Sequence, residues 1–185
     1  MEKKELVFIT GNSDKAKYLA DFFHRPITHK KLDLPEIQSL DLREVVEDKA
    51  RRAFAEVGAP VLVEDVSVIF EALQNLPGPF IKWFEKALEN EGICRLLDGT
   101  PNRKATVEVM FGYCDGDNVQ MFSGVVKGRI ADHPIGEGGF GWDKIFIHEG
   151  FEKTRAEMTK DEWHEFGMRK IALEKLSIFL DTLHT

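Results

Sequence analysis

Short apolar runs alternate with stretches of helical periodicity along most of the chain. This alternation is typical of a mixed α/β protein, in which buried strands are connected by amphipathic helices. The predicted strands span residues 6–10, 61–63, 105–113, 118–130 and 145–147. The turn sequence Asp115-Gly116-Asp117 predicts that two of them form a hairpin.

Residues 41–57 form the clearest amphipathic helix, with a capping pattern of Asp41 followed by Glu44. Its apolar residues recur at helical spacing and so share one face: Leu42, Val45, Val46, Ala50, Ala53, Phe54 and Val57. Lys49 falls inside this apolar stripe, where a lysine is costly unless its ammonium reaches solvent or meets an anion. We therefore expect Lys49 to face an anion. Further helices are predicted up to about Phe23, over 67–74, after Trp83 into 90–97, and over 161–183.

A glycine-containing loop, residues 11–15, connects the first strand to the first helix. This arrangement points free backbone N–H groups at an anion. Lys15 lies in the first helical turn, where a cation is unfavourable unless an anion sits nearby. The alternative is an ordinary helix cap by Asn12 or Ser13 beside a solvated lysine.

Glu64 and Asp65 come directly after the apolar run 61–63 and are expected at the carboxyl end of that strand. Successive side chains alternate faces, so the two carboxylates cannot point the same way. Ligands of α/β sheets sit at strand carboxyl ends, and a carboxylate there can hold a metal or activate a water. The alternative is a pair of ordinary surface charges. Glu36, which follows Pro35 in a polar passage, is favoured by the sequence alone as a solvated loop acid.

Residues 136–143 form a glycine-rich loop that ends in aromatic and acidic side chains. Phe140 and Trp142 could stack on a flat heterocycle, and Asp143 could accept hydrogen bonds from ring N–H groups. A loop anchored by its own aromatic residues is an equal alternative. Lys82 is a second lysine in an apolar setting, just after the proline-glycine turn 76–79.

Composition narrows the classes of function. The chain has 185 residues, 43% of them apolar, and a formal net charge of −7. This acidic balance, without a run of Lys or Arg, argues against nucleic-acid binding but allows a small anion if lysines gather in one cleft. The two cysteines, Cys94 and Cys114, predict reduced thiols in a cytoplasmic protein. No apolar run is long enough to cross a membrane, and the N-terminus does not resemble a signal peptide.

Several motifs, taken in order, resemble those of the inosine/xanthosine triphosphate pyrophosphatases. They are Thr10-Gly11-Asn12 with Lys15, Leu34-Pro35-Glu36, Val63-Glu64-Asp65, Leu76-Pro77-Gly78-Pro79 with Lys82-Trp83-Phe84, Phe140-Gly141-Trp142-Asp143, and Ala156-Glu157-Met158-Thr159. The resemblance implies a single domain over residues 1–185, with an elongated mixed sheet, flanking helices and two lobes around a deep cleft. It also implies a homodimer and Mg²⁺-dependent hydrolysis of a nucleoside triphosphate to the monophosphate and pyrophosphate.

The resemblance also implies residue roles. Asp65 and Lys15 would be catalytic, and Glu36 with Asp65 would bind Mg²⁺, with Glu44 as the alternative second carboxylate. The implied substrate-binding residues are Thr10, Gly11, Asn12, Ser13, Asp14, Lys15, Lys49, Lys82, Phe140, Gly141, Trp142, Asp143 and Arg169. The lysines would hold phosphates, and Trp142 would stack on the base. In this reading Lys15, Lys49 and Asp65 converge on one groove.

The C-terminal part departs from the family pattern. Where the family has Glu-Lys-Asn and then Ser-His-Arg, the chain reads Glu162-Trp163-His164 and Gly167-Met168-Arg169. The lysine, serine and histidine that read the purine 6-oxo group are therefore absent, and only Arg169 remains. Three functions stay open: a pyrophosphatase acting on inosine/xanthosine triphosphates or on another modified nucleotide, a non-catalytic nucleotide-binding protein, and a hydrolase of a phosphorylated small molecule without a base.

Overall fold

The computed structural model describes residues 6–24, 26–116 and 118–183. Its strands are β1 (Val7–Ile9), β2 (His29–Lys30), β3 (Val61–Phe70), β4 (Pro77–Gly78), β5 (Lys104–Cys114), β6 (Val119–Ile130) and β7 (Phe146–His148). Its α-helices are α1 (Ser13–Phe23), α2 (Leu42–Val57), α3 (Ile81–Arg95), α4 (Lys160–Glu165) and α5 (Met168–Thr182). Short 3-10 helices are η1 (Glu71–Leu73), η2 (Gly141–Lys144) and η3 (Arg155–Glu157).

The strands form one sheet in the order β2-β1-β3-β5-β6-β7, with β4 pairing separately with β3. β1 is parallel to β2 and β3, whereas β4 and β7 are antiparallel to their neighbours. The mixed α/β fold predicted from the sequence is therefore confirmed. β5 and β6 are neighbours, as the predicted hairpin requires, although Asp117 of its turn lies outside the described residues.

The chain divides into two compact units. Unit 1 comprises residues 1–65, 110–123 and 172–185, and unit 2 comprises residues 66–109 and 124–171. The long strands β3, β5 and β6 contribute residues to both units. The two-lobed arrangement expected from the family resemblance stays a prediction.

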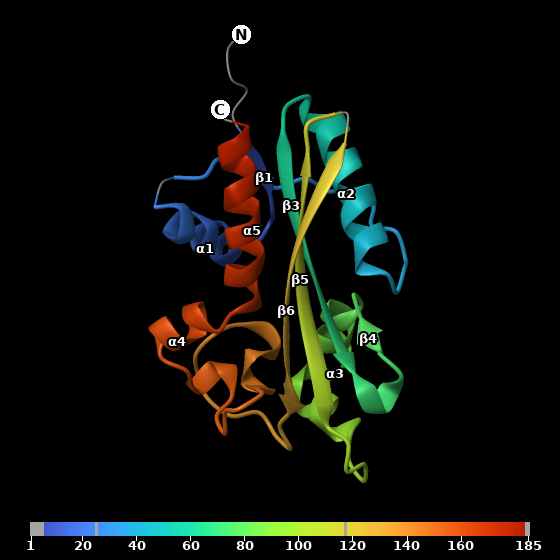
Figure 1. The fold of residues 1–185 in the computed structure, drawn as a ribbon. Coiled ribbons are helices and arrows are strands. Elements are labelled where there is room, and N and C mark those ends of the chain that lie inside the picture. The colour runs from blue at the N-terminus through green and yellow to red at the C-terminus, as the bar shows by residue number, and fades with distance from the viewer. Residues whose placement is uncertain (1–5, 25, 117, 184–185) are drawn as a thin grey trace. The chain divides into compact units, whose positions relative to one another are not determined.

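Unit 1 has helices on both faces of its part of the sheet, with α2 on one face and α1 and α5 on the other (Figure 1). The predicted apolar stripe of α2 is buried and packs on β1, β3 and β5. The buried members of this core are Ile9, Leu42, Val46, Ala50, Ala53, Val61, Val63, Met110 and Cys114. α2 begins after Asp41, whose carboxylate accepts from the amide of Arg43, and ends at Val57, followed by Gly58 in the left-handed region.

β3 is longer than the sequence suggested. The strand was expected to end at Glu64 and Asp65 and to be followed by a helix over residues 67–74. Instead it runs through both carboxylates to Phe70, and only Glu71–Leu73 forms a 3-10 turn. The pairing of β1 with β3 does end here, at Ile9 and Val63. The two carboxylates thus lie one step beyond the carboxyl end of β1, rather than of their own strand.

Unit 2 contains β4, β7, α3 and the segments around η2 and η3. The last predicted helix, over 161–183, is two helices: α4 ends at Glu165, and α5 begins at Met168 after Gly167. α3 is continuous except at Glu89, whose φ of 55° is not helical. Among the residues that the structure describes, no helix has the length and apolar character needed to span a membrane.

Candidate functional site

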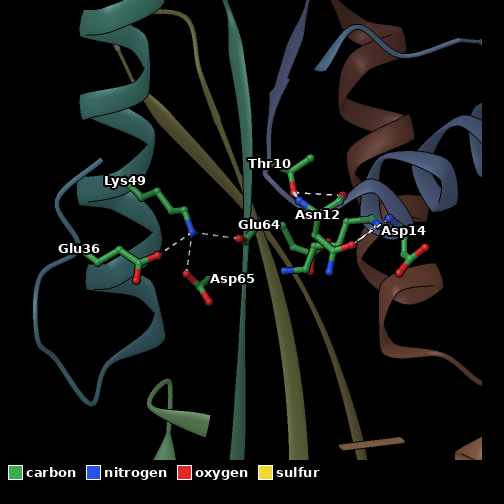
Figure 2. A network of polar contacts seen from close by, with 8 residues as sticks. Thr10, Asn12, Asp14, Glu36, Lys49, Glu64 and Asp65 are labelled. Atoms are coloured by element: carbon green, nitrogen blue, oxygen red, sulfur yellow. Dashed lines mark hydrogen bonds and ion pairs between the residues drawn. The ribbon is translucent and has the colours of Figure 1, made fainter. Parts of the chain in front are cut away.

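Lys49 is the centre of a polar cluster in unit 1. Its Nζ lies 2.9 Å from Oδ2 of Asp65 and 3.2 Å from Oε1 of Glu36. These carboxylates come from β3 and from the loop before α2, and they approach the ammonium from separate directions (Figure 2). The prediction that Lys49 faces an anion is confirmed, and the anions are two carboxylates of the protein. Glu36 is therefore more than the solvated loop acid that the sequence alone favoured.

The side chains of the Lys49 cluster are partly exposed and charged, so each of them could bind a ligand in place of its present partner. The side chains of Lys49, Asp65 and Glu36 are 18%, 20% and 40% exposed. Burial lowers the pKa of Lys49, but the adjacent carboxylates of Asp65 and Glu36 outweigh this and raise it above its usual value. The lysine is therefore a permanent cation within reach of solvent.

A second ion pair lies on the other side of β3. Lys15 Nζ is 2.9 Å from Oε1 of Glu64, a carboxylate whose side chain is 1% exposed. Because Glu64 and Asp65 are consecutive on a strand, they point to opposite faces, as predicted. In Figure 2, Lys49 with Asp65 and the loop from Thr10 to Asp14 accordingly lie on opposite sides of β3. Lys15, Lys49 and Asp65 therefore do not meet at one point: Lys49 contacts Asp65, and Lys15 contacts the neighbouring carboxylate.

The loop after β1 is organised by its own side chains. Oδ1 of Asn12 accepts from the amides of Asp14 and Lys15 at 2.8 and 3.3 Å, which is the helix cap proposed as an alternative. Oγ1 of Thr10 accepts from the amide of Asn12 at 3.1 Å. The anion that neutralises Lys15 in this structure is Glu64. Gly11, Ser13 and Asp14 are exposed, so this face of the loop is open to solvent.

The unit 1 cluster has a donor set that suits a hard divalent cation. Two carboxylates, from Glu36 and Asp65, reach the same ammonium, and Mg²⁺ typically uses one or two carboxylates together with waters and phosphate oxygens. Within residues 6–24, 26–116 and 118–183 no group of three or more His, Cys, Asp or Glu side chains could enclose a metal by itself. Glu44 instead accepts from the hydroxyl of Ser39 at 2.7 Å, so of the two candidate second ligands Glu36 is the one beside Asp65.

Unit 2 holds a different kind of polar network, centred on Asp143. Its Oδ1 accepts from Nε of Arg155 at 2.8 Å, and its Oδ2 accepts from Nε1 of Trp163 at 2.9 Å and from the amide of Phe140 at 3.1 Å. Nη1 of Arg155 donates to Nε2 of His148 at 2.8 Å. Asp143 and Arg155 are each only 2% exposed. Asp143 was predicted to accept from a base, and here three groups of the protein already donate to it.

Burial shifts the pKa of two groups in this part of unit 2. Burial, and then the neighbouring Arg155, lower the pKa of His148 to about 4, so its ring is neutral at pH 7. Its Nε2 therefore accepts the bond from Arg155 and its proton resides on Nδ1. Burial, followed by the charge of Asp143, raises the pKa of Glu85 above its usual value.

The aromatic residues of the glycine-rich loop have different exposures. Trp142, which was expected to stack on a base, is 7% exposed and packs edge-to-face on Phe146. This contradicts a stacking role for Trp142, because its side chain is part of the core. Phe140 is half-buried and lies between Trp163, at 6.0 Å between ring centroids, and the guanidinium of Arg169 at 5.2 Å.

The other predicted binding residues of unit 2 fall at different places. Arg169 is 3% exposed and covers the Phe140 ring, whereas Lys82 is exposed in the first turn of α3, with its Nζ 5.8 Å from the ring of Trp83. Gly141 has a φ of 62°, and its carbonyl accepts from Nδ2 of Asn90 at 2.9 Å.

Sequence reasoning missed several residues of these clusters. Glu64 was recognised as a carboxylate but not as the partner of Lys15, which the alternation along β3 could have suggested. Arg155 and His148 were not singled out, since no local pattern marks a buried guanidinium. Trp163 was noted only as a departure from the family pattern, yet its indole N–H is part of the network around Asp143.

The fold and the unit 1 cluster together define a class: α/β proteins with a strand–loop–helix segment capped by an asparagine and a lysine between two carboxylates. Comparison with known families makes this specific. Residues 6–179 match the model of the Ham1 family, so the chain belongs to that family.

Relatives and solved structures agree with this assignment. The chain is 40% identical to "Inosine triphosphate pyrophosphatase 2" of Trypanosoma cruzi, over 93% of this chain and 90% of that protein. It is also 40% identical to "dITP/XTP pyrophosphatase" of Methanopyrus kandleri, over 94% of each. Among solved structures, a HAM1 protein from Coxiella burnetii matches with a TM-score of 0.83 and 26% identity, covering 97% of this chain and 99% of that one. The Staphylococcus aureus Ham1 protein matches with a TM-score of 0.82 and 25% identity, covering 96% and 99%.

Proposed function

We propose that this protein is a nucleoside triphosphate pyrophosphatase that hydrolyses inosine- and xanthosine-type or other modified purine nucleotides, and so removes them from the nucleotide pool. The observation that carries the proposal is the cluster of Glu36, Lys49 and Asp65, in a chain similar along its length to proteins with pyrophosphatase names. A lysine between two partly exposed carboxylates suits a reaction in which negative charge accumulates on phosphate oxygens.

The proposed chemistry is attack of a water on the α-phosphorus. Asp65 orients the water and takes its proton as the oxygen–phosphorus bond forms. The bond from the α-phosphorus to the bridging oxygen breaks, and pyrophosphate leaves with the bonding electron pair. Lys49 offsets part of the charge that develops on the departing oxygens. When bound by Glu36 and Asp65, Mg²⁺ supplies further charge neutralisation at the phosphates.

Lys15 has a related role in this proposal. Its ammonium is neutralised by Glu64, on the opposite side of β3 from Lys49. β1 stops pairing with β3 at Ile9 and Val63, and the loop that holds Asn12 follows on the side of β3 opposite Asp65. We assign the exposed residues Gly11, Ser13 and Asp14, with Thr10 and Asn12, to phosphate binding, and Phe140 and Arg169 to the base.

The test is a panel of nucleoside triphosphates with purified protein and Mg²⁺, in which pyrophosphate and orthophosphate are assayed separately. Pyrophosphate release from ITP or XTP that stops on addition of EDTA supports the proposal. Saturable nucleotide binding without release from any member would indicate a non-catalytic binder. Release of orthophosphate from phosphorylated small molecules, but not from nucleotides, would indicate a different hydrolase on this scaffold.

Three further assignments belong to this proposal. The family resemblance suggests a homodimer, which sedimentation at micromolar protein would detect. The free, buried thiols of Cys94 and Cys114 suit a reducing compartment, and we propose the cytoplasm. The substrate is a free nucleotide, and the net charge of −7 disfavours a nucleic-acid partner.

A further inference from the structure

Lys31, the residue after β2, lies against the loop that follows β1. The two strands are parallel, with Ile9 paired to Lys30, and the amide of Thr10 donates to the carbonyl of Lys30 at 3.0 Å. Parallel neighbours end at the same edge of a sheet, so the chain after β2 and the loop after β1 emerge together. Strand pairing therefore brings Lys31 to Gly11, although the two are distant in sequence.

The aliphatic part of Lys31 packs closely on Gly11. The position that a Cβ of Gly11 would take is 3.3 Å from Cγ of Lys31 and 3.4 Å from its Cδ and Cε. The φ of Gly11 is not positive, so its backbone conformation does not require a glycine. A methyl group would instead press on the lysine, and the missing side chain leaves room for it. Because Cε lies beside the loop, the ammonium one bond further is also beside it.

Lys31 differs from the lysines of the two ion-pair clusters in its partners. Lys15 is paired with Glu64, and Lys49 is paired with two carboxylates. Lys31 is exposed, and within residues 6–24, 26–116 and 118–183 no carboxylate pairs with it. An anion that binds Lys31 therefore has no ion pair to break first, and it gains the whole attraction of the ammonium.

We propose that Lys31 binds the terminal phosphates of the substrate, together with the loop of residues 10–14. The inference rests on the proposed function, in which this loop binds phosphate and a water attacks the α-phosphorus beside Asp65. Asp65 is on the opposite side of β3 from the loop, so the phosphates at the loop are those furthest from the reaction (Figure 2). The ligand class that Lys31 recognises is a pyrophosphate group, which is present in the triphosphate and in the product that leaves.

The first experiment measures the Kd of inorganic pyrophosphate in the presence of Mg²⁺ by titration calorimetry. Lys31→Met keeps the apolar part of the side chain and removes the ammonium. We expect its Kd to be about tenfold higher than that of the wild type, the order of one lost contact to a charged group. Lys30→Met is the matched control, because it removes the same charge from the adjacent exposed residue, and its Kd should stay at the wild-type value. No binding to the wild type, or equal Kd values for the two variants, overturns the inference.

Steady-state kinetics locate the contact along the substrate. The terminal phosphates carry their charge both before and during the reaction, so Lys31→Met should raise KM for ITP about tenfold and leave kcat within about twofold. Inhibition by inosine monophosphate should be unchanged, since this molecule lacks the terminal phosphates. An equal weakening of inhibition by inosine monophosphate and by pyrophosphate overturns the inference, while pyrophosphate release would still support the proposed function.

A conservative variant separates phosphate binding from a structural role. Lys31→Arg keeps a cation that binds phosphate, so it should restore most of the affinity for pyrophosphate that Lys31→Met loses. An affinity no better than that of Lys31→Met overturns the inference. If no nucleotide is hydrolysed, the proposed function fails, and the pyrophosphate titration of the same three variants still decides whether Lys31 holds a pyrophosphate group.

Discussion

Both units contain an acid–base cluster, but the two clusters differ in exposure. In unit 1, Lys49 and Asp65 are 18% and 20% exposed, and a second carboxylate, Glu36, completes the set. In unit 2, the side chains of Arg155 and Asp143 are 1% and 4% exposed, and they bond to each other, to His148 and to Trp163. The Lys49 cluster therefore lies within reach of solvent, whereas the pair of Arg155 and Asp143 lies in the core.

This difference in exposure indicates that the unit 1 cluster can take part in a reaction and that the unit 2 cluster stabilises the fold. A partly exposed carboxylate can exchange a lysine for a cation or a water at modest cost. A buried pair cannot, because removing one partner leaves an uncompensated charge in a region of low dielectric. We therefore expect changes in unit 1 to affect activity first and changes in unit 2 to affect stability first.

The largest effect is expected for Asp65→Asn. The amide cannot take a proton from water, so the rate of pyrophosphate release should fall about 10³-fold, within the usual range for loss of a general base. The free energy of unfolding should change by less than about 1 kcal/mol, since the carboxylate is partly exposed. Asp48→Asn on α2 is the matched control, because Asp48 is a partly exposed carboxylate that pairs with Arg52 of the same helix. Equal activities of these two variants would contradict the assignment of Asp65.

Arg155→Met should have the largest effect on stability. It leaves Asp143 buried without its cation, a change that typically costs about 3–5 kcal/mol. Urea unfolding of the variant measures this cost. Adding Asp143→Asn to Arg155→Met removes the uncompensated charge, so the double variant should be more stable than the single one. A single variant as stable as the wild type would show that the pair is not the buried network described above.

The lowered pKa of His148 should make the free energy of unfolding depend on pH. Burial, and then Arg155, lower its folded pKa to about 4, below the 6.5 of an exposed histidine. A lowered folded pKa means that the contribution is present above pH 6.5 and is lost as the pH falls towards 4, because the unfolded chain takes up the proton first. The difference corresponds to roughly 3 kcal/mol.

The measurement is the free energy of unfolding of wild type and His148→Gln between pH 7 and pH 4. The glutamine oxygen can still accept from Arg155 but does not titrate. The stability of the wild type should therefore fall more steeply over this interval than that of the variant. Parallel curves would show that His148 titrates as if it were exposed.

The smallest effect is a contrast between the two lysines of unit 1. Lys15→Met removes the cation from Glu64, whose side chain is 1% exposed, and should cost roughly 2 kcal/mol. Lys49→Met leaves two partly exposed carboxylates and should cost less than about 1 kcal/mol. Thermal unfolding of both variants at the same pH tests the order. A larger loss for Lys49→Met would reverse the relation between exposure and structural role in this unit.

The structural features predicted best from the sequence are those for which hydrophobic periodicity and local capping chemistry agree. The stripe of α2, its cap at Asp41 and the inward position of Lys49 all follow from helical spacing. The cap of α1 by Asn12 follows from its position before the first turn. Such features depend on residues close together in the chain, and so a pattern can reveal them.

Other features depended on contacts that sequence spacing does not contain. β3 was expected to stop at Glu64 because charged residues usually leave the core, but Lys15 and Lys49 neutralise both carboxylates and the strand continues. Trp142 was expected to stack on a base, whereas its ring packs on Phe146 in the core. No local pattern marked the buried Arg155, since Asp143, His148 and Trp163, which it contacts, are 7 to 12 positions away along the chain.

The alternation of β3 has a consequence for how this segment tolerates change in length. Deleting one residue between Val61 and Val63 would turn Asp65 towards α1 and Glu64 towards α2, and would reverse which carboxylate each lysine meets. Surface loops usually tolerate insertions. In this segment of β3, by contrast, the number of residues decides the face of the sheet on which each carboxylate lies. Among natural variants of the protein, we expect substitutions in this stretch but no gain or loss of a single residue.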